Sequence, residues 1–361
     1  MTIAVRLATD VDRDAWDRYV ASCPDAAGYH EWSWRSIFEK TFGHKCHYLL
    51  ACPEPENPTT REPENPIGVL PLVEIRSLLF GRSLTSLPFV NFGGVLADSD
   101  DAARALVNKA SELARQFKSK HVELRHIARR FDDLPCKQHK VTMRLQLEAA
   151  AAGTAGKSED SPLWSKIDRK ARNQVRKAQK SNLTVVRGGV ELVDEFYSVF
   201  ARNMRDLGTP VYARRLFSDV LTTFPGRAHL IVVRLADKPV AAGLTFRTRG
   251  MVEIPWASSI RDYNALCPNH LLYWHAIETA AAEGADVFDF GRSTPDEGTF
   301  KFKEQWGAEP TALHWEYWLA SGKLPDQSPK NPKFKLMIET WKRLPLWAAN
   351  LAGPGIVRAI P

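Results

Sequence analysis

The chain has 361 residues, of which 44% are hydrophobic and 25% are charged, with a formal net charge of +7. This length exceeds one ordinary core, so two domains are expected, and the mild basic excess permits an anionic partner without requiring one. The sequence has no apolar run near the roughly 18 residues of a membrane helix and no apolar signal-type stretch at its start, which predicts a cytoplasmic protein. Its 5 scattered cysteines lack metal-ligand spacing and predict reduced thiols and no metal site.

The first part of the chain alternates extended and helical patterns. Helices are predicted at 12–21, 31–41 and 100–117, and strands at 47–52, 67–77, 84–98, 121–127 and 141–147. Residues 53–66 are almost entirely turn formers and charged residues, as in a hairpin loop or insertion. The small and polar residues of 148–162 predict a linker at 151–162, with a surface loop inside one domain as the alternative.

After this linker the alternation resumes. Helices are predicted at 162–182, 190–208, 213–225 and 270–285, and strands at 183–189, 228–259, 287–293 and 314–320. Both parts thus combine mixed, mostly antiparallel sheets with flanking helices, which is an α+β architecture. We expect an N-terminal domain at 1–150, a C-terminal domain at 163–320 and a basic amphipathic tail at 321–361. The tail is expected to pack back on the N-terminal domain, and contact with a membrane surface is the alternative.

Several common catalytic motifs are missing from the sequence. It has no GxxxxGK[ST] phosphate loop, no GxGxxG, no GxSxG elbow and no HExxH. An acetyl-CoA transferase usually carries an (R/Q)xxGx(G/A) turn at a helix start, where backbone amides bind the pyrophosphate. The nearest match, "RNMRDLG" at 202–208, leads into "TPVY" and not into a glycine-rich helix start. Hydride transfer, ATP hydrolysis and serine hydrolysis therefore lack their usual residues.

The predicted helix around 166–180 carries one strongly basic face. Four cations recur on it at helical spacing: Arg169, Arg172, Arg176 and Lys180. Such a face repels itself unless an anion neutralises it, so a nucleotide, a phosphate or tRNA is a candidate ligand, and DNA is not expected. A solvated helix face is the alternative.

Two further segments combine polar and aromatic residues in a way that a core does not need. The connector within 204–217 presents Asp206, Tyr212 and Arg215, and a Tyr/Arg pair beside a helix start can hold a carboxylate or phosphate. The segment 254–274 offers apolar walls with a few hydrogen-bonding groups, as ligand pockets do. Its candidate pocket residues are Trp256, Ser258, Tyr263, Asn264, Tyr273 and Trp274. Structural packing is the alternative for both segments.

The segment "FDFGRSTPDEGTFKFKEQWGAEP" at 288–310 places polar groups at the end of a buried strand. Arg292 and Ser293 end this strand, and Lys301 and Lys303 then alternate with phenylalanines. This alternation predicts that the aromatic rings point one way and the lysines the other. A lysine fixed between aromatic rings would supply a positive charge for an oxyanion or a phosphate.

The order of these motifs resembles the Fem peptidyltransferases (FemABX family). The basic "KIDRKARNQVRKAQK" precedes the strand pair "AHLIVVRLADKPVAAGLTF" and then "FDFGRS" and "GTFKFKEQWG", and the likeness is most specific over 160–310. More closely, "RDLGTPVY", "EIPWASS" and "NHLLYWHAIE" are similar to FemAB-related proteins found with exopolysaccharide and PEP-CTERM sorting loci in Gram-negative bacteria.

This resemblance implies two tandem GNAT-like acyltransferase domains, no tightly bound cofactor, and an aminoacyl-tRNA or acyl-CoA donor. Fem enzymes attach amino acids to the peptide of a cell-wall precursor, and the lysine of an "FKxxFG"-like motif steadies the transfer intermediate. The matching position here is Lys303 in "FKEQWG", where tryptophan stands in place of the family's phenylalanine. The long two-helix arm of some members has no counterpart, so the resemblance does not extend to tRNA binding by an arm.

We therefore predict a cytoplasmic, amide-forming acyl- or aminoacyltransferase, with the inner face of the membrane as the alternative location. Its acceptor would be an amine-bearing envelope or exopolysaccharide precursor, either an anionic small molecule or a lipid-linked sugar. Lys303 would steady the oxyanion, Arg292 and Arg215 would hold acceptor anions, and Asp206 and Asp289 are candidate bases. A CoA-dependent N-acyltransferase and a non-catalytic precursor-binding module are the alternatives. Because we take Lys303 to be exposed, Lys303→Ala should abolish activity with little loss of stability.

Overall fold

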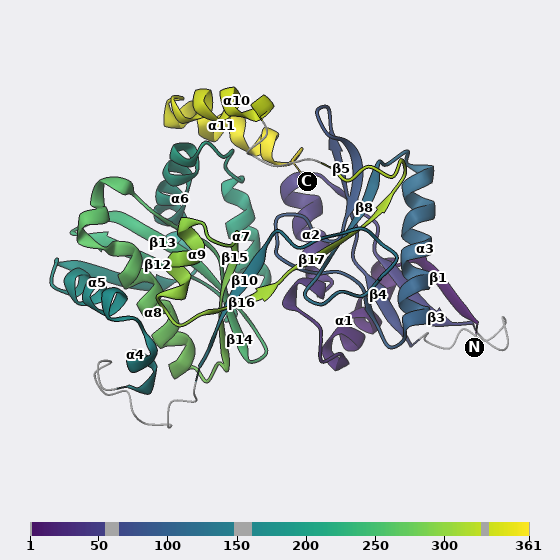
Figure 1. Cartoon of the computed structure of the whole chain (residues 1–361), viewed down its shortest axis with the longest axis horizontal. Coiled ribbons are helices and arrows are strands. Elements are labelled where there is room, and N and C mark those ends of the chain that lie inside the picture. The colour runs from purple at the N-terminus through teal and green to yellow at the C-terminus, as the bar shows by residue number, and fades with distance from the viewer. Residues whose placement is uncertain (1, 55–64, 148–160, 326–331, 361) are drawn as a thin grey trace. The chain divides into compact units, whose positions relative to one another are not determined.

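The computed structural model describes residues 2–54, 65–147, 161–325 and 332–360, and residues 151–160 of the expected linker lie outside them (Figure 1). The chain forms two compact units. Unit 1 comprises Met1–Gln138, Ala312–Gln327 and Arg358–Pro361, and unit 2 comprises His139–Thr311 and Ser328–Val357. The chain therefore crosses between the units more than once.

Unit 1 contains two sheets and the helices that cover them. One sheet has the order β1 (Ile3–Leu7), β3 (Leu49–Pro53), β4 (Gly68–Leu70) and β7 (Leu96–Ala97). The other has the order β2 (Lys45–Cys46), β5 (Val73–Ser77), β6 (Gly81–Thr85), β8 (His121–His126), β17 (His314–Leu319) and β9 (Cys136–Lys137). The α-helices are α1 (Arg13–Ser22), α2 (Ser33–Ile37) and α3 (Asp100–Gln116), and the π-helical turn η3 (Phe38–Phe42) continues α2.

Helix α3 shows how the sequence specifies the core of unit 1. Ser99 caps the helix by accepting a hydrogen bond from the backbone amide of Ala102. Leu106, Val107 and Ala110 recur at helical spacing, and they pack with strand residues in one apolar cluster. The second sheet also buries charges, because Arg125 Nε donates to Glu123 Oε1 at 2.7 Å in a fully enclosed pair. Such a pair depends on both partners, since removing one leaves an uncompensated buried charge.

Unit 2 is built on one seven-stranded sheet. Its order is β11 (Leu183–Gly188), β12 (Ala228–Leu235), β13 (Lys238–Thr248), β14 (Met251–Ser259), β15 (Val287–Ser293), β10 (Val141–Gln146) and β16 (Glu309–Ala312). Its helices are α4 (Pro162–Lys166), α5 (Arg169–Gln179), α6 (Val193–Leu207), α7 (Arg214–Thr223), α8 (Pro268–Ala282), α9 (Gly298–Glu304), α10 (Pro332–Lys342) and α11 (Leu346–Val357). The pair β14–β15 is parallel, whereas the pairs formed by β11 to β14 in sequence are antiparallel.

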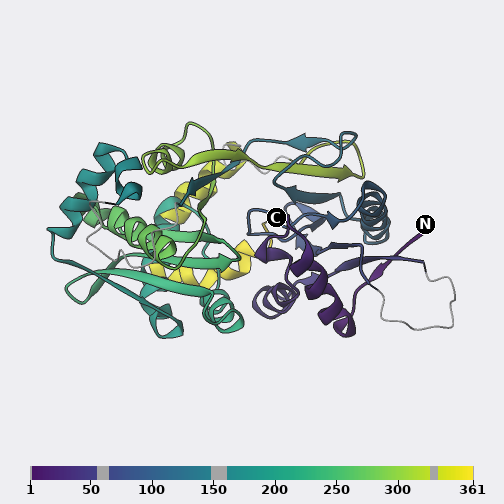
Figure 2. The same cartoon turned by 90° about the horizontal axis from the view of Figure 1, so that it is seen from below.

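The two faces of this sheet are covered by different helices. Helices α5 and α8 pack together and share an apolar cluster with Ile231, Val252 and Phe288 of the sheet. Helices α6 and α7 lie on the other side of the sheet (Figure 2). They supply a separate aromatic group, in which Phe217 contacts Phe200 and Phe196. Because side chains alternate between the faces of a sheet, residues that contact α7 and residues that contact α8 lie on opposite sides.

The α+β class with mostly antiparallel sheets flanked by helices is confirmed, but the division of the chain differs from the expected boundaries. Strand β10 pairs with β15 and belongs to unit 2, although it precedes residue 150. Strand β17 pairs with β8 and belongs to unit 1, although the sequence placed it in the second domain. Helices α10 and α11 contact α6 of unit 2, whereas we expected the tail to pack on the N-terminal domain. Across the described ranges, every helix is too short or too polar to cross a membrane.

Candidate functional site

The central feature of unit 2 is the point where β14 and β15 stop pairing. Their parallel register runs from Met251–Val287 to Glu253–Asp289. Beyond this point β14 continues along β13, and β15 continues along β10. Beyond this point the facing edges of the two strands do not pair with each other, which is the arrangement that strand addition by an extended ligand requires.

A bulge in each strand follows the last parallel pair and explains the separation. In β14, Leu244 pairs with Trp256 but Phe246 pairs with Glu253, so one extra residue lies between them on β14. Pro255 lies in this bulge, and proline has no N–H for the sheet. In β15, the register shifts between Thr142–Arg292 and Arg144–Asp289. The bulged part of β15 contains Gly291, whose φ of +72° is a left-handed conformation that favours glycine.

Asp289 is the buried carboxylate at this point, and its side chain is fully enclosed. It accepts hydrogen bonds from Thr142 Oγ1 at 2.5 Å, the Gly291 amide at 2.7 Å and Arg144 Nε at 3.0 Å. These bonds hold the β15 bulge against β10. A carboxylate with three donors on it is poorly placed to act as a general base, so this geometry favours a positioning role for Asp289.

Lys303 lies beside this carboxylate, and its side chain is only 6% exposed. Its ammonium donates to the carbonyl oxygens of Gly291 at 2.9 Å and Arg292 at 3.0 Å. Burial lowers the pKa of Lys303 to about 8, while the negative charges of Asp289 and Glu253 oppose this change. An ammonium has three N–H donors, and two are occupied, so one is left for a ligand.

The position of Lys303 corrects two of our expectations. Residues 298–304 form helix α9 instead of an alternating strand, so Lys301 is exposed while Lys303 points inward. Because Lys303 is buried and hydrogen-bonded, its replacement should also affect folding, contrary to the expectation for an exposed lysine. The strand prediction was wrong because phenylalanines at alternate positions also occur in a helix that buries only part of its surface.

A cluster of aromatic rings lies next to helix α9 on the α8 side of the sheet. Tyr273 stacks on Phe290 with ring centroids 5.5 Å apart and contacts Phe302 edge-on at 5.2 Å. His270 lies 5.0 Å from the Phe302 ring and 5.9 Å from the Trp306 ring. Burial lowers the pKa of His270 to about 4, so it is neutral at physiological pH. These rings form part of the apolar cluster between α8 and the sheet.

Two other predicted residues lie at the end of β15. Arg292 is exposed, while Ser293 is 3% exposed and its hydroxyl has no hydrogen-bond partner among the described residues. A buried hydroxyl without a partner costs free energy, which makes Ser293 Oγ a natural donor or acceptor for a ligand at this edge. The structure thus brings Lys303, Arg292, Ser293 and Tyr273 into one region.

A second group of predicted residues lies on the opposite face. Trp256 contacts Phe217 of α7 at 5.5 Å and Tyr212 at 6.5 Å between ring centroids. Ser258 is buried and accepts a hydrogen bond from Asn203 Nδ2 at 3.0 Å. The predicted residues of 254–274 therefore do not line one pocket, because Trp256 faces α7, whereas Tyr273 lies on α8 at the opposite face of the sheet.

The remaining candidates from these segments are tied to other partners. Asp206 pairs with Arg205 at 2.6 Å, which leaves it less available as a base. Arg215 is largely exposed and pairs with Asp219 one helical turn later. Tyr263 is half-buried under Lys238, and Asn264 is exposed.

The basic helix α5 is amphipathic and packs its apolar side on α8. Asp168 caps it by accepting from the Lys170 amide at 2.6 Å. Arg169 and Lys180 are exposed, Arg172 is half-buried, and Arg176 lies over the Trp164 ring at 5.4 Å. The geometry leaves several cations facing solvent, and anion binding by this helix stays a prediction.

The N-terminus of α8 departs from a usual pyrophosphate cradle. Pro268 occupies the first helical position and has no N–H. The amides of His270 and Leu271 both donate to the Cys267 carbonyl, at 3.0 and 3.4 Å. The helix therefore offers fewer free amides to a pyrophosphate than a glycine-rich start would. The residues fit that group poorly at this position, in line with the missing sequence motif.

Sequence reasoning missed the residues that organise the site from β10. Thr142 and Arg144 occupy alternate positions of a strand whose other face is apolar, and this was the available signal. Glu253 on β14 was also missed; it is 2% exposed and lies opposite Asp289 in the parallel register. A buried acid in a strand predicts a nearby cation, which here is Lys303.

Comparison with known proteins supports the fold and the general class of reaction. Residues 165–304, within unit 2, match the family model described as an acetyltransferase (GNAT) domain. No curated protein matches the sequence significantly. Enzymes with this domain take the acyl group from acyl-CoA, and the match identifies the chain as an acyl- or aminoacyltransferase in general.

Three solved structures resemble most of the chain. A FemX crystal structure has a TM-score of 0.61 at 15% identity and covers 86% of this chain and 96% of its own. The C-terminal domain of a putative lysylphosphatidylglycerol synthetase from Agrobacterium fabrum has a TM-score of 0.56 at 12% identity, with coverages of 86% and 93%. A tandem GNAT protein from the clavulanic acid biosynthesis pathway has a TM-score of 0.52 at 12% identity, with coverages of 90% and 99%. At these identities the likeness establishes the tandem GNAT-like fold.

Proposed function

We propose that the protein forms an amide bond by transferring an acyl or aminoacyl group to an amine at the point where β14 and β15 separate. The observation that carries this proposal is the buried ammonium of Lys303, which has one N–H left beside the point where β14 and β15 stop pairing with each other. A fixed positive charge in a dry environment stabilises a developing oxyanion strongly. The site lies inside the segment that matches the acetyltransferase domain.

The chemistry needed at such a site is mainly orientation and charge stabilisation. The acceptor nitrogen attacks the carbonyl of an ester or thioester, so a C–N bond forms and the C–O or C–S bond breaks. Lys303 donates its remaining hydrogen bond to the carbonyl oxygen as negative charge develops there. The amine proton passes to the departing alcohol or thiol through the substrates, because Asp206 and Asp289 are both held by other groups. Arg292 and Ser293 are placed to bind polar groups of the ligand.

The donor is either acyl-CoA or aminoacyl-tRNA, and the structure bears on both. The acetyltransferase match favours acyl-CoA, whereas the blocked amides at the start of α8 count against a usual pyrophosphate cradle. The exposed cations of α5 offer a separate surface for the phosphates of either donor. For the acceptor, we propose an amine-bearing precursor of the cell envelope or of an exopolysaccharide, including lipid-linked forms. The likeness to FemX and to a putative lysylphosphatidylglycerol synthetase supports an envelope or lipid acceptor.

Contact with a membrane is part of this proposal, and the tail helices supply it. Leu336, Trp347 and Leu351 are each more than two-thirds exposed, at 78%, 71% and 78%. From 332 to 358 the basic residues Lys333, Lys335, Lys342, Arg343 and Arg358 outnumber the single acid Glu339. Exposed apolar residues among basic ones suit the surface of an anionic membrane.

The deciding experiment measures transfer and donor retention together. Purified protein is incubated with tRNA charged with labelled amino acids and, separately, with labelled acetyl-CoA, and an amine-bearing lipid-linked precursor is then added. Label should be retained from one donor and should appear in amide linkage on the acceptor. Lys303→Met should reduce the transfer by about 100-fold or more, the usual effect of removing one oxyanion donor, whereas Lys323→Met, an exposed lysine in a loop of unit 1, should not. Full transfer by a folded Lys303→Met protein would favour a non-catalytic precursor-binding module instead.

A further inference from the structure

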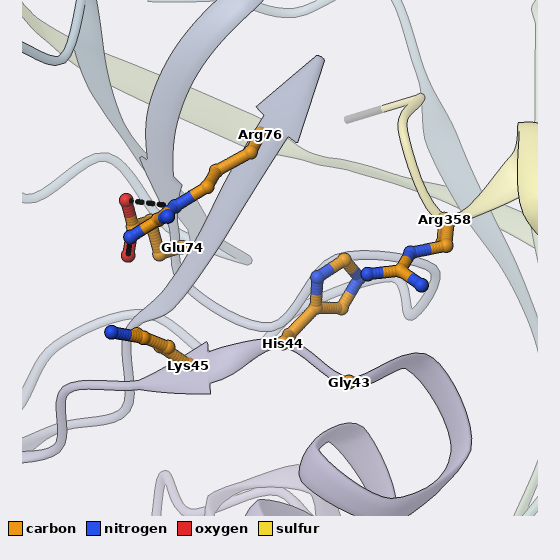
Figure 3. A pocket seen from close by; sticks show the side chains of 6 residues that line it. All are labelled: Gly43, His44, Lys45, Glu74, Arg76 and Arg358. Carbon is orange, nitrogen blue, oxygen red and sulfur yellow. Dashed lines mark hydrogen bonds and ion pairs between the residues drawn. The ribbon is translucent and has the colours of Figure 1, made fainter.

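Unit 1 contains a small basic cavity that the transfer reaction does not use. Its volume is about 160 Å³, and it lies where η3 leads into β2, next to β5. Figure 3 shows Lys45 and the Glu74–Arg76 pair on one side of it and His44 and Arg358 on the other. Gly43, whose φ is +66°, completes the lining and ends η3 in a left-handed turn.

The acid in this lining is already neutralised. Glu74 is 2% exposed and accepts hydrogen bonds from Arg76 Nε at 2.8 Å and Arg76 Nη2 at 3.1 Å. Arg82 Nε lies 3.2 Å from the same carboxylate, so two guanidinium groups face one acid. These arginines and His47 hold the pKa of Glu74 below its ordinary value against the effect of burial, so it is ionised at neutral pH. The group around Glu74 therefore carries a net positive charge.

Two further cations in the lining have no such partner. Lys45 and Arg358 are both exposed, and neither forms an ion pair with any residue that the structure describes. Among the lining residues, three cations thus stand against one carboxylate, a formal charge of +2 (3 − 1). Like charges gathered around a hollow repel one another unless an anion lies between them.

His44 adds a buried polar atom to the same lining. Its side chain is 8% exposed, and its Nε2 atom has no hydrogen-bond partner among the described residues. The ring stacks on Phe42 at 5.6 Å, which fixes its plane. Burial and, to a smaller extent, the neighbouring Arg358 lower the pKa of His44 to about 4. A neutral imidazole can donate or accept one hydrogen bond here, and a buried polar atom of this kind normally has a partner.

We propose that this cavity is a binding site for a phosphoryl group, held by Lys45 and Arg358 with His44 at its base. A tetrahedral oxyanion matches the separate positive groups around the hollow, and guanidinium and ammonium groups are the usual phosphate ligands. Arg76, already bound to Glu74, contributes its charge to the rim. The ligand is either free phosphate or the phosphate of a larger molecule, such as a nucleoside diphosphate or sugar phosphate.

Titration calorimetry of the full-length protein tests this proposal without any transfer assay. The probes are inorganic phosphate, pyrophosphate and uridine diphosphate, each in buffer matched to the same ionic strength with chloride. At least one probe should bind with 1:1 stoichiometry, and Lys45→Ala and Arg358→Ala should each weaken its binding by about tenfold or more, since each removes a charge-assisted contact. Tighter binding of uridine diphosphate than of phosphate would assign the site to a larger ligand, and similar affinities would assign it to the free ion.

Matched variants separate this site from general attraction to a basic protein. Lys323→Ala and Arg18→Ala remove one exposed lysine and one exposed arginine from unit 1 and should leave the affinity unchanged. A second readout is the imidazole NMR signal of His44 at fixed pH, which the phosphate should shift while the signals of histidines outside the cavity stay in place. No binding of any probe beyond the chloride control, or equal weakening by the cavity variants and the matched variants, would refute the site.

Discussion

Lys303→Met gives a quantitative test of how Lys303 is buried. The folded protein holds the pKa of this lysine at about 8, compared with 10.5 when it is unperturbed. Each pKa unit corresponds to about 1.4 kcal/mol, so the buried ammonium costs about 3 kcal/mol below pH 8. Because the pKa is lower in the folded state, the unfolded state binds more protons between the two values, and stability increases as the pH rises through this window. Methionine, which is of similar length, removes the titration.

The measurement is the free energy of unfolding of both proteins in urea. The wild-type value minus the Lys303→Met value should increase by about 2 kcal/mol between pH 7 and pH 9.5. At neutral pH we expect only a small difference in the free energy of unfolding between the two proteins. Methionine removes the cost of burying a charge, and this gain opposes the loss of the hydrogen bonds to the carbonyls of Gly291 and Arg292. A difference that does not vary with pH would refute the described burial. If the variant fails to fold, NMR titration of 13C-labelled lysines in the wild type still decides, since one lysine should titrate near pH 8.

Three other changes test separate features of the chain. The hydrogen bond from Arg6 to Asp12, at 2.7 Å, lowers the pKa of Asp12 to about 2. Ionised Asp12 therefore stabilises the fold above pH 4, and this effect is lost as the pH falls toward 2. In urea unfolding, Asp12→Asn should cost about 2 kcal/mol at pH 7 and little at pH 2. Gly291→Ala should lower the stability by about 1 kcal/mol or more because of its left-handed φ, and a thermal melt with unchanged midpoint would contradict the bulge. Joint replacement of Trp347 and Leu351 by alanine should weaken binding to anionic vesicles at least about tenfold in a sedimentation assay, and the melting midpoint should stay unchanged. Equal binding by the wild type and the double variant would show that the tail does not contact the membrane.

The secondary structure of unit 2 was largely predictable because it depends on local patterns. The basic helix, the strand pair around the Ala236–Asp237 turn and the apolar helix at 268–282 all follow from periodicity and turn residues. Pairing between distant strands does not leave such a local pattern. The sequence analysis therefore placed β10 with the N-terminal domain and β17 with the C-terminal domain, whereas they belong to the opposite units, and with β10 it missed Thr142 and Arg144, which hold Asp289.

The candidate site was predicted in part for the same reason. Lys303 and Ser293 were proposed because Ser293 ends a buried strand and Lys303 follows it, and Tyr273 because aromatic and polar residues cluster around it. Which side chains share a face was not predictable, because the bulge at Pro255 changes the alternation of β14. Trp256 consequently faces α7, and the residues expected in one pocket are divided between two faces of the sheet.

The exchange of strands between the units constrains how a ribosome can produce this protein. Strand β17 lies between β8 and β9 in its sheet, so the N-terminal unit is incomplete until residue 319 has been synthesised. Glu316 of this strand accepts hydrogen bonds from His126 at 2.6 Å and from the Phe131 amide at 2.7 Å. In the nascent chain both donors therefore lack this partner until β17 has been synthesised. Synthesis of unit 1 therefore begins first but ends after the strands of unit 2 are complete. Unit 2 can complete its sheet while the sheet of unit 1 still has an open edge. A nascent chain in this state exposes strand edges that favour intermolecular pairing, and fragments cut near residue 150 should inherit the same hazard.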